Sequence, residues 1–115
     1  MFLPSLLELT LFVSDVDKSA TFYRALGIKL FDANEPSRPH MVDGAIARDA
    51  GLQLFPSGNK PTTRVQFGFR VADLARVAAE LDRLNIRYEL PMVRRLRTAD
   101  PDGNRVHLTE VAERE

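Results

Sequence analysis

Residues 100–110 combine a tight turn with a strand that carries one histidine. The opening Asp-Pro-Asp-Gly is typical of a turn, because proline presets φ, aspartate hydrogen-bonds nearby backbone and glycine accepts the left-handed conformation. In the strand that follows, apolar Val106 and Leu108 alternate with polar residues, so the two sets lie on opposite faces. The polar set is Arg105, His107 and Thr109. His107 is therefore expected in the lining of a cupped binding site.

Each half of the chain offers comparable chemistry, with one polar side chain from its first strand and one from its last. These pairs are Glu8 with Gln53, and Gln66 with His107. Two modules that face each other would bring the four side chains together. On the same strand faces we also expect Thr10, Phe12, Phe55 and Arg70.

The first half of the chain is predicted to form a strand, a helix and three further strands, and these elements position Glu8 and Gln53. Asp15 is placed to cap the helix, since its carboxylate can accept from free backbone N–H groups. Gly27 suits the helix exit. The predicted strands are residues 7–13, 28–31, 41–48 and 51–55, and the predicted helix is residues 16–26.

The pattern restarts after a polar linker at residues 57–63. Asp73 is again placed as a helix cap and Asn85 as the exit. The predicted strands are residues 65–71, 87–90, 92–97 and 105–110, and the helix is residues 74–84.

The two halves align without a gap when 58 is added to each number. Identical residues then coincide at Val13 and Val71, Asp15 and Asp73, Ala20 and Ala78, Leu26 and Leu84, and Ile28 and Ile86. The sequence therefore predicts an α+β fold of two tandem βαβββ modules, with concave mixed sheets and one helix per module on the outer face. We expect a single domain over residues 1–115, with module one at about 6–56 and module two at about 64–110.

Composition excludes several classes of function. Sixteen basic residues balance sixteen acidic ones, so no electrostatic argument supports binding to nucleic acid or to a membrane surface. The absence of cysteine excludes a disulfide framework, a thiolate nucleophile and a cysteine zinc site. Neither a basic leader nor a spanning apolar run is present, and we expect a cytoplasmic protein.

The chain resembles the vicinal oxygen chelate superfamily in three features. These are the paired modules, the segment Val-Ser-Asp-Val-Asp-Lys-Ser-Ala-Thr-Phe-Tyr at 13–23 and the closing Asp-Pro-Asp-Gly-Asn-Arg-Val-His-Leu. That superfamily includes glyoxalase I, bleomycin- and fosfomycin-resistance proteins and extradiol dioxygenases. The resemblance covers about residues 6–110. It implies a small-molecule ligand or substrate, and a homodimer whose sites often combine one module from each subunit.

The resemblance also implies a position for a divalent ion such as Zn, Ni, Mn or Fe. The metal ligands of relatives fall by position on Glu8, Gln53, Gln66 and His107, and the ion would stabilise an anionic intermediate as a Lewis acid. Two amides stand where relatives mostly carry histidine or carboxylate, which Zn and Fe favour. The iron triad of extradiol dioxygenases is absent at these positions, so ring cleavage is disfavoured.

Structural roles compete with functional ones at each candidate. Glu8 and His107 could form a hydrogen-bonded pair or a solvated lining, and the two glutamines could be polar walls or ligand contacts. Phe12 and Phe55 could stack on a ligand or fill the cup. Arg70 could hold a carboxylate or phosphate, or form a surface ion pair.

Other polar residues favour structural interpretations. The basic run of Arg94, Arg95 and Arg97 is typical of a solvated or interface edge. Asp100 and Asp102 are interpreted as turn residues, and His40 lies in a loop that matches no ligand position.

Three functions remain open on these grounds. The first is a metal-dependent lyase or isomerase like glyoxalase, in which Glu8 would be the general base. The second is a metal-free protein that binds and sequesters a small antibiotic-like molecule, which needs only shape and stacking. A non-catalytic accessory subunit is a third possibility.

Overall fold

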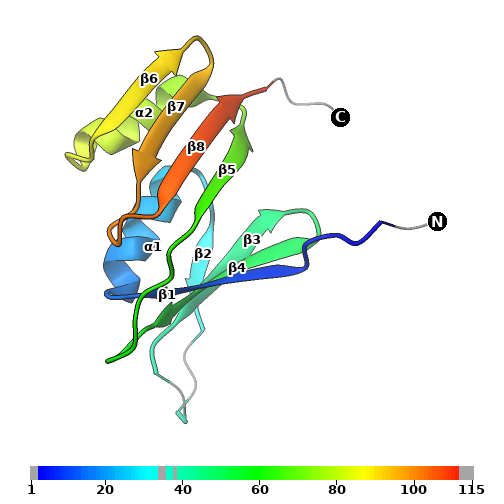
Figure 1. Cartoon of the computed structure of the whole chain (residues 1–115), viewed down its shortest axis with the longest axis vertical. Helices are drawn as coiled ribbons and strands as arrows, with labels where there is room; N and C mark the ends of the chain where they lie inside the picture. Colours follow the sequence, from blue (N-terminus) through cyan, green and yellow to red (C-terminus); the bar gives the residue numbers. More distant parts are fainter. Residues whose placement is uncertain (1–2, 34–35, 38, 112–115) are drawn as a thin grey trace.

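The computed structural model describes residues 3–33, 36–37 and 39–111, and shows two four-stranded sheets with one helix each (Figure 1). Sheet 1 has the strand order β1-β4-β3-β2, and sheet 2 has the order β5-β8-β7-β6. The first module consists of β1 (Glu8–Val13), α1 (Val16–Ala25), β2 (Leu30–Asp32), β3 (Val42–Ala47) and β4 (Ala50–Pro56). The second consists of β5 (Gln66–Val71), α2 (Leu74–Arg83), β6 (Tyr88–Met92), β7 (Arg95–Ala99) and β8 (Arg105–Glu110).

The predicted duplication is confirmed in its first two elements. Adding 58 to the bounds of β1 and α1 reproduces those of β5 and α2. In both modules the first strand pairs in parallel with the last, and the remaining pairs are antiparallel. The register of these parallel pairs is also equivalent. Thr10 stands beside Gln53 in module one, and the corresponding residue Gly68 stands beside His107 in module two.

Both helices begin at the predicted residue and end one residue earlier than predicted. The carboxylates of Asp15 and Asp73 each accept a backbone N–H three residues on, at 3.0 Å. Gly27 and Asn85 follow the helices with φ of 104° and 57°, the left-handed conformation that ends a helix. Neither helix in the described part of the chain has the length and apolar character that crossing a membrane requires.

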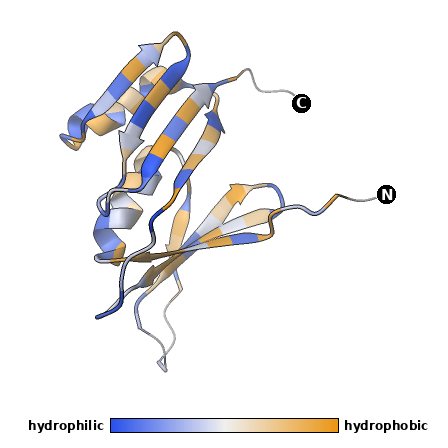
Figure 2. Cartoon of the chain, in the orientation of Figure 1, coloured by the Kyte–Doolittle hydropathy of each residue, from blue (hydrophilic) through white to orange (hydrophobic). Residues whose placement is uncertain are grey.

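The core lies between each sheet and its helix. Figure 2 shows the alternation of hydrophilic and hydrophobic residues along β5, β8 and β7, which is the two-residue period of a sheet with one buried face. The fully buried strand residues include Leu11, Val13, Leu52, Leu54, Val106 and Leu108. Burial of these side chains is the main stabilising term of the fold, at about 1.5–3 kcal/mol each.

The modules share this core because α1 also contacts the second module. Tyr23 of α1 stacks on Phe67 of β5 with ring centroids 6.2 Å apart, and α1 packs against α2. The Tyr23 hydroxyl donates to the Asp100 carboxylate at 2.7 Å. Ser14 donates its backbone N–H and its hydroxyl to Asp102, at 3.1 and 2.6 Å. The Asp-Pro-Asp-Gly turn therefore joins the two modules as well as turning the chain.

Some predicted strand ends shift by one to three residues, most visibly around Pro91. The sequence predicted a break there, yet β6 continues through Pro91, and the turn falls at residues 93–94, where Arg94 has φ of 65°. Proline is tolerated because β6 is an edge strand and its pairing with β7 is irregular between Glu89 and Met92.

Candidate binding site on the open sheet faces

Each sheet has an open face, defined here as the face opposite its buried side chains. The polar and aromatic residues predicted for this face lie on it, and their side chains range from half-buried to exposed. In sheet 1 these are Glu8, Thr10, Phe12, Gln53 and Phe55, with Asp43 beside Gln53. In sheet 2 they are Gln66, Arg70, Arg105, His107 and Thr109, with Arg95 and Arg97 from β7.

The open face of sheet 1 is aromatic and amide-bearing. Phe12 remains 46% exposed and meets Phe55 edge to face, with ring centroids 6.1 Å apart. The Thr10 hydroxyl donates to Oε1 of Gln53 at 2.9 Å, so this amide oxygen already accepts a hydrogen bond. Farther along the same strands, Glu8 lines a shallow hollow of about 440 Å³ together with Gln53.

The open face of sheet 2 is cationic around His107. Arg97 lies opposite His107 on the neighbouring strand, and Arg105 precedes it by two residues on the same face. Together with Gln66 they line a hollow of about 1080 Å³. Arg97 also donates to Glu89 through two nitrogens at 3.2 Å, which lowers the pKa of the Glu89 carboxyl below its usual value.

A second polar pair stands at the edge of this hollow. Tyr88 and Asp82 both line it, and a hydrogen bond to Asp82 raises the pKa of the Tyr88 phenol. Tyr88 pairs with Thr98, whose side chain is on the buried face, so this polar pair borders the hollow from the helix side of sheet 2.

Within one chain, the four predicted chelate positions fall into two separate pairs. Glu8 and Gln53 line the hollow on sheet 1, and Gln66 and His107 line the hollow on sheet 2. The two hollows share no lining residue.

The donors at these positions fit a divalent ion poorly. Among the described residues, no three histidine or carboxylate side chains come together. An assembly of two chains would offer one carboxylate, one imidazole and two amides, and the Gln53 amide oxygen is already engaged by Thr10. Arg97 and Arg105 beside His107 would repel a cation. We therefore derive no chemical step through a metal.

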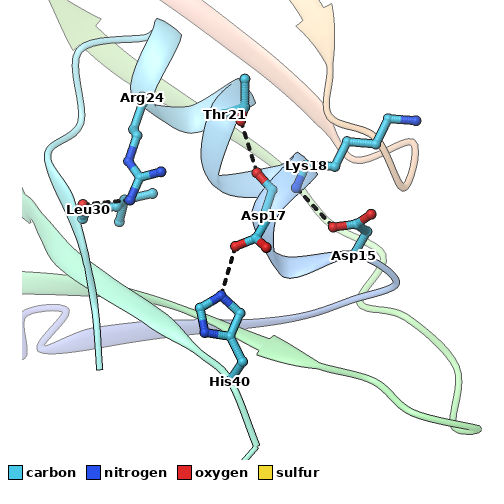
Figure 3. Close-up of polar contacts among 7 residues, drawn as sticks. All are labelled: Asp15, Asp17, Lys18, Thr21, Arg24, Leu30 and His40. Carbon is cyan, nitrogen blue, oxygen red and sulfur yellow. Dashed lines mark hydrogen bonds and ion pairs between the residues drawn. The ribbon is translucent and has the colours of Figure 1, made fainter. Parts of the chain in front are cut away.

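The second histidine lies away from both open faces. His40 contacts Asp17 in the first turn of α1, with Nε2 and Oδ1 2.7 Å apart (Figure 3). In the same view, Arg24 donates to the Leu30 carbonyl oxygen at 2.8 Å and ties the end of α1 to β2. The contact with Asp17 joins the segment before β3 to the first turn of α1.

Arg97 was not predicted on this face, and Arg105 was placed there with His107 but was given no role in the site. The basic run was interpreted as a solvated or interface edge, and its side chains are indeed exposed. Their strand β7 is internal, however, and its pairing with β8 brings Arg97 opposite His107.

Solved structures with the same fold have different stated roles. An antibiotic-binding protein, TnmS3 from Streptomyces sp. CB03234, is 21% identical with a TM-score of 0.70, covering 97% of this chain and 99% of its own. A lactoylglutathione lyase from Agrobacterium tumefaciens is 20% identical with a TM-score of 0.64, covering 92% of each chain. Oxidase ChaP-H1 is 18% identical with a TM-score of 0.71, covering 95% of this chain and 97% of its own.

At these identities the likeness shows the fold alone. No curated protein matches the sequence significantly. The sequence model of one family does match, over residues 5–108 and so over nearly the whole chain. The chain therefore belongs to the glyoxalase/bleomycin resistance protein/dioxygenase superfamily.

Proposed function

We propose that this protein binds a small aromatic molecule without a metal, as a homodimer in which sheet 1 of one subunit and sheet 2 of the other enclose each site. The observation that carries the proposal is the composition of the four chelate positions: two are amides, one of them already hydrogen-bonded, and His107 lies among arginines. Such a set suits a polar ligand better than it suits a cation.

The aromatic pair on sheet 1 supports a ligand that stacks. Phe12 keeps nearly half of its surface exposed, although burying an aromatic side chain is strongly favourable. A flat ligand placed against Phe12 and Phe55 would remove this apolar surface from water. The antibiotic-binding neighbour has the same fold and is consistent with this use of it.

Charge supports the pairing of unlike faces in the dimer. Sheet 1 presents Glu8 and Asp43 on its open face, whereas sheet 2 presents mainly arginines. Opposed faces of two subunits would therefore attract each other, and a two-fold axis would produce two equivalent sites.

A screen of aromatic, antibiotic-like compounds by thermal shift tests the proposal, together with elemental analysis of protein purified without chelator. We expect ligands that raise the melting temperature and no stoichiometric ion. Phe12→Ala should lower the affinity of a hit by about tenfold, since truncating a buried aromatic contact costs about 1–3 kcal/mol.

Phe31→Ala is the matched control. Phe31 is 65% exposed, on the same face of sheet 1, but on edge strand β2, three strands and about 14 Å from β1. It should leave the affinity unchanged. A stoichiometric ion that is lost in both Glu8→Ala and His107→Ala would overturn the proposal and favour the metal-dependent lyase or isomerase instead.

A further inference from the structure

The open face of sheet 2 carries an excess of positive charge that no described residue neutralises. It presents four guanidinium groups and one carboxylate. These belong to Arg70, Arg95, Arg97, Arg105 and Glu89. Only Arg97 is paired, with Glu89, whereas the other three arginines form no side-chain hydrogen bond or ion pair with any described residue.

Two of the four arginines line one defined hollow. Arg97 and Arg105 line the same space as His107 and Gln66. Like charges on neighbouring strands repel each other, and the repulsion is relieved only by a counter-charge. A guanidinium presents several N–H donors in one plane, which matches the oxygens of a carboxylate or phosphonate.

Gly68 leaves one flank of His107 open. It stands beside His107 in the parallel pair, where module one has Thr10 beside Gln53. A Cβ at Gly68 would approach the His107 carbonyl oxygen to 3.2 Å, so a side chain would crowd this position. On this face, the neighbour of His107 on β5 therefore has no side chain, whereas its neighbour on β7 is Arg97.

The opposite subunit does not supply enough negative charge to fill this role. On the open face of sheet 1 the carboxylates are those of Glu8 and Asp43. Sheet 2 contributes four guanidinium groups and the carboxylate of Glu89, and sheet 1 contributes two further carboxylates, so the net charge of a closed site remains positive. A ligand with its own negative charge would complete it.

We propose that the ligand is an anion: a small aromatic acid whose carboxylate or phosphonate lies between Arg97 and Arg105, next to His107. This inference rests on the proposed function and specifies its ligand class. In this arrangement the aromatic pair of sheet 1 binds the ring of the ligand, and Arg97 and Arg105 of sheet 2 bind its carboxylate or phosphonate.

A matched pair of probes tests this on the full-length protein. Calorimetry would compare 2-naphthoate with naphthalene-2-carboxamide, which has nearly the same shape but no charge. We expect the acid to bind at least about tenfold more tightly, because hydrogen bonds to a charged group are about twice as strong as neutral ones. Arg105→Gln and Arg97→Gln should each reduce the affinity for the acid about tenfold and leave the amide unaffected.

Arg76→Gln is the control, since it removes the same charge from an exposed position on α2. Equal losses in Arg76→Gln and Arg105→Gln would overturn the inference, because the effect would then be one of net charge. Equal binding of acid and amide would overturn it too and leave the proposed function standing. Binding of neither probe would contradict both. Urea unfolding of each variant verifies that the fold is intact.

Discussion

Asp100 shows how much one residue of a turn can organise. Its buried carboxylate accepts from the Tyr23 hydroxyl, the Asn104 side chain and the backbone N–H groups of Asp102 and Asn104, at 2.7–3.0 Å. The turn interpretation of Asp100 is confirmed. What the turn motif did not indicate is the bond to Tyr23, which reaches across 77 residues to the other module.

Removing the Tyr23 hydroxyl tests this contact. Tyr23→Phe keeps the ring on Phe67 but leaves Asp100 without one of its donors, so we expect a loss of about 1–3 kcal/mol in the free energy of unfolding by urea at neutral pH. Burial, and then the bond to Asp100, raises the pKa of the Tyr23 phenol. In the unfolded chain this phenol loses its proton near pH 10, whereas the folded state keeps it, so wild-type stability should fall as pH rises above about 10.

The variant supplies its own control for that pH dependence. The pKa of Tyr88 is also raised, so part of the alkaline loss belongs to Tyr88 and persists in Tyr23→Phe. The difference between the two proteins isolates Tyr23, and it should shrink between pH 9 and 11. A constant difference would show that the phenol of Tyr23 ionises equally in both states.

At the scale of elements, sheet 1 depends on a close approach at Gly44. This residue of β3 pairs with Leu30 of β2 and Leu52 of β4. A Cβ built there would overlap the backbone carbonyl of Lys29, which leads into β2. The approach of the two backbones therefore requires glycine, independently of its conformational freedom.

Gly44→Ala should destabilise the protein by more than about 2 kcal/mol, since the clash is with backbone and β2 must move. Gly51→Ala, in the adjacent strand, is the matched control. Its Cβ would meet the Gly44 carbonyl oxygen at an ordinary 3.5 Å, so we expect a change within about 0.5 kcal/mol. Urea midpoints compare the two, and equal losses would refute the close approach.

For the whole molecule, the central consequence is that the two halves of the candidate site line separate hollows in one chain. Both open faces are accessible in the monomer, with Phe12 exposed on one and Arg105 on the other. If the dimer closes each site from unlike faces, then Phe12 of one subunit and Arg105 of its partner serve the same site.

Subunit complementation tests this arrangement. Chains with Phe12→Ala and chains with Arg105→Gln should each bind 2-naphthoate weakly as homodimers. Coexpressed, half of the dimers are mixed, and each mixed dimer regains one intact site, so about a quarter of the wild-type capacity should return. If each site belonged to a single chain, every chain would carry a defect and no capacity would return.

The sequence by itself determined the elements and their faces. Period-two alternation places His107 on the other face of β8 from Val106 and Leu108, and the capping aspartates mark the starts of both helices. These signals can be read from the sequence because they depend only on residues a few positions away. The exact shift of 58 between the first strands and helices revealed the duplication for the same reason.

Only the tertiary structure decided which side chains are neighbours across strands. The hydrogen bond between Thr10 and Gln53, the position of Arg97 opposite His107, and the separation of the two polar pairs all depend on long-range pairing. Pro91 illustrates the limit: proline normally ends a strand, but on the free edge of β6 no partner requires its missing N–H. Local sequence pattern specifies the sheet face on which a residue lies. The side chains beside it depend on strand register and edge position, which arise from contacts between distant segments.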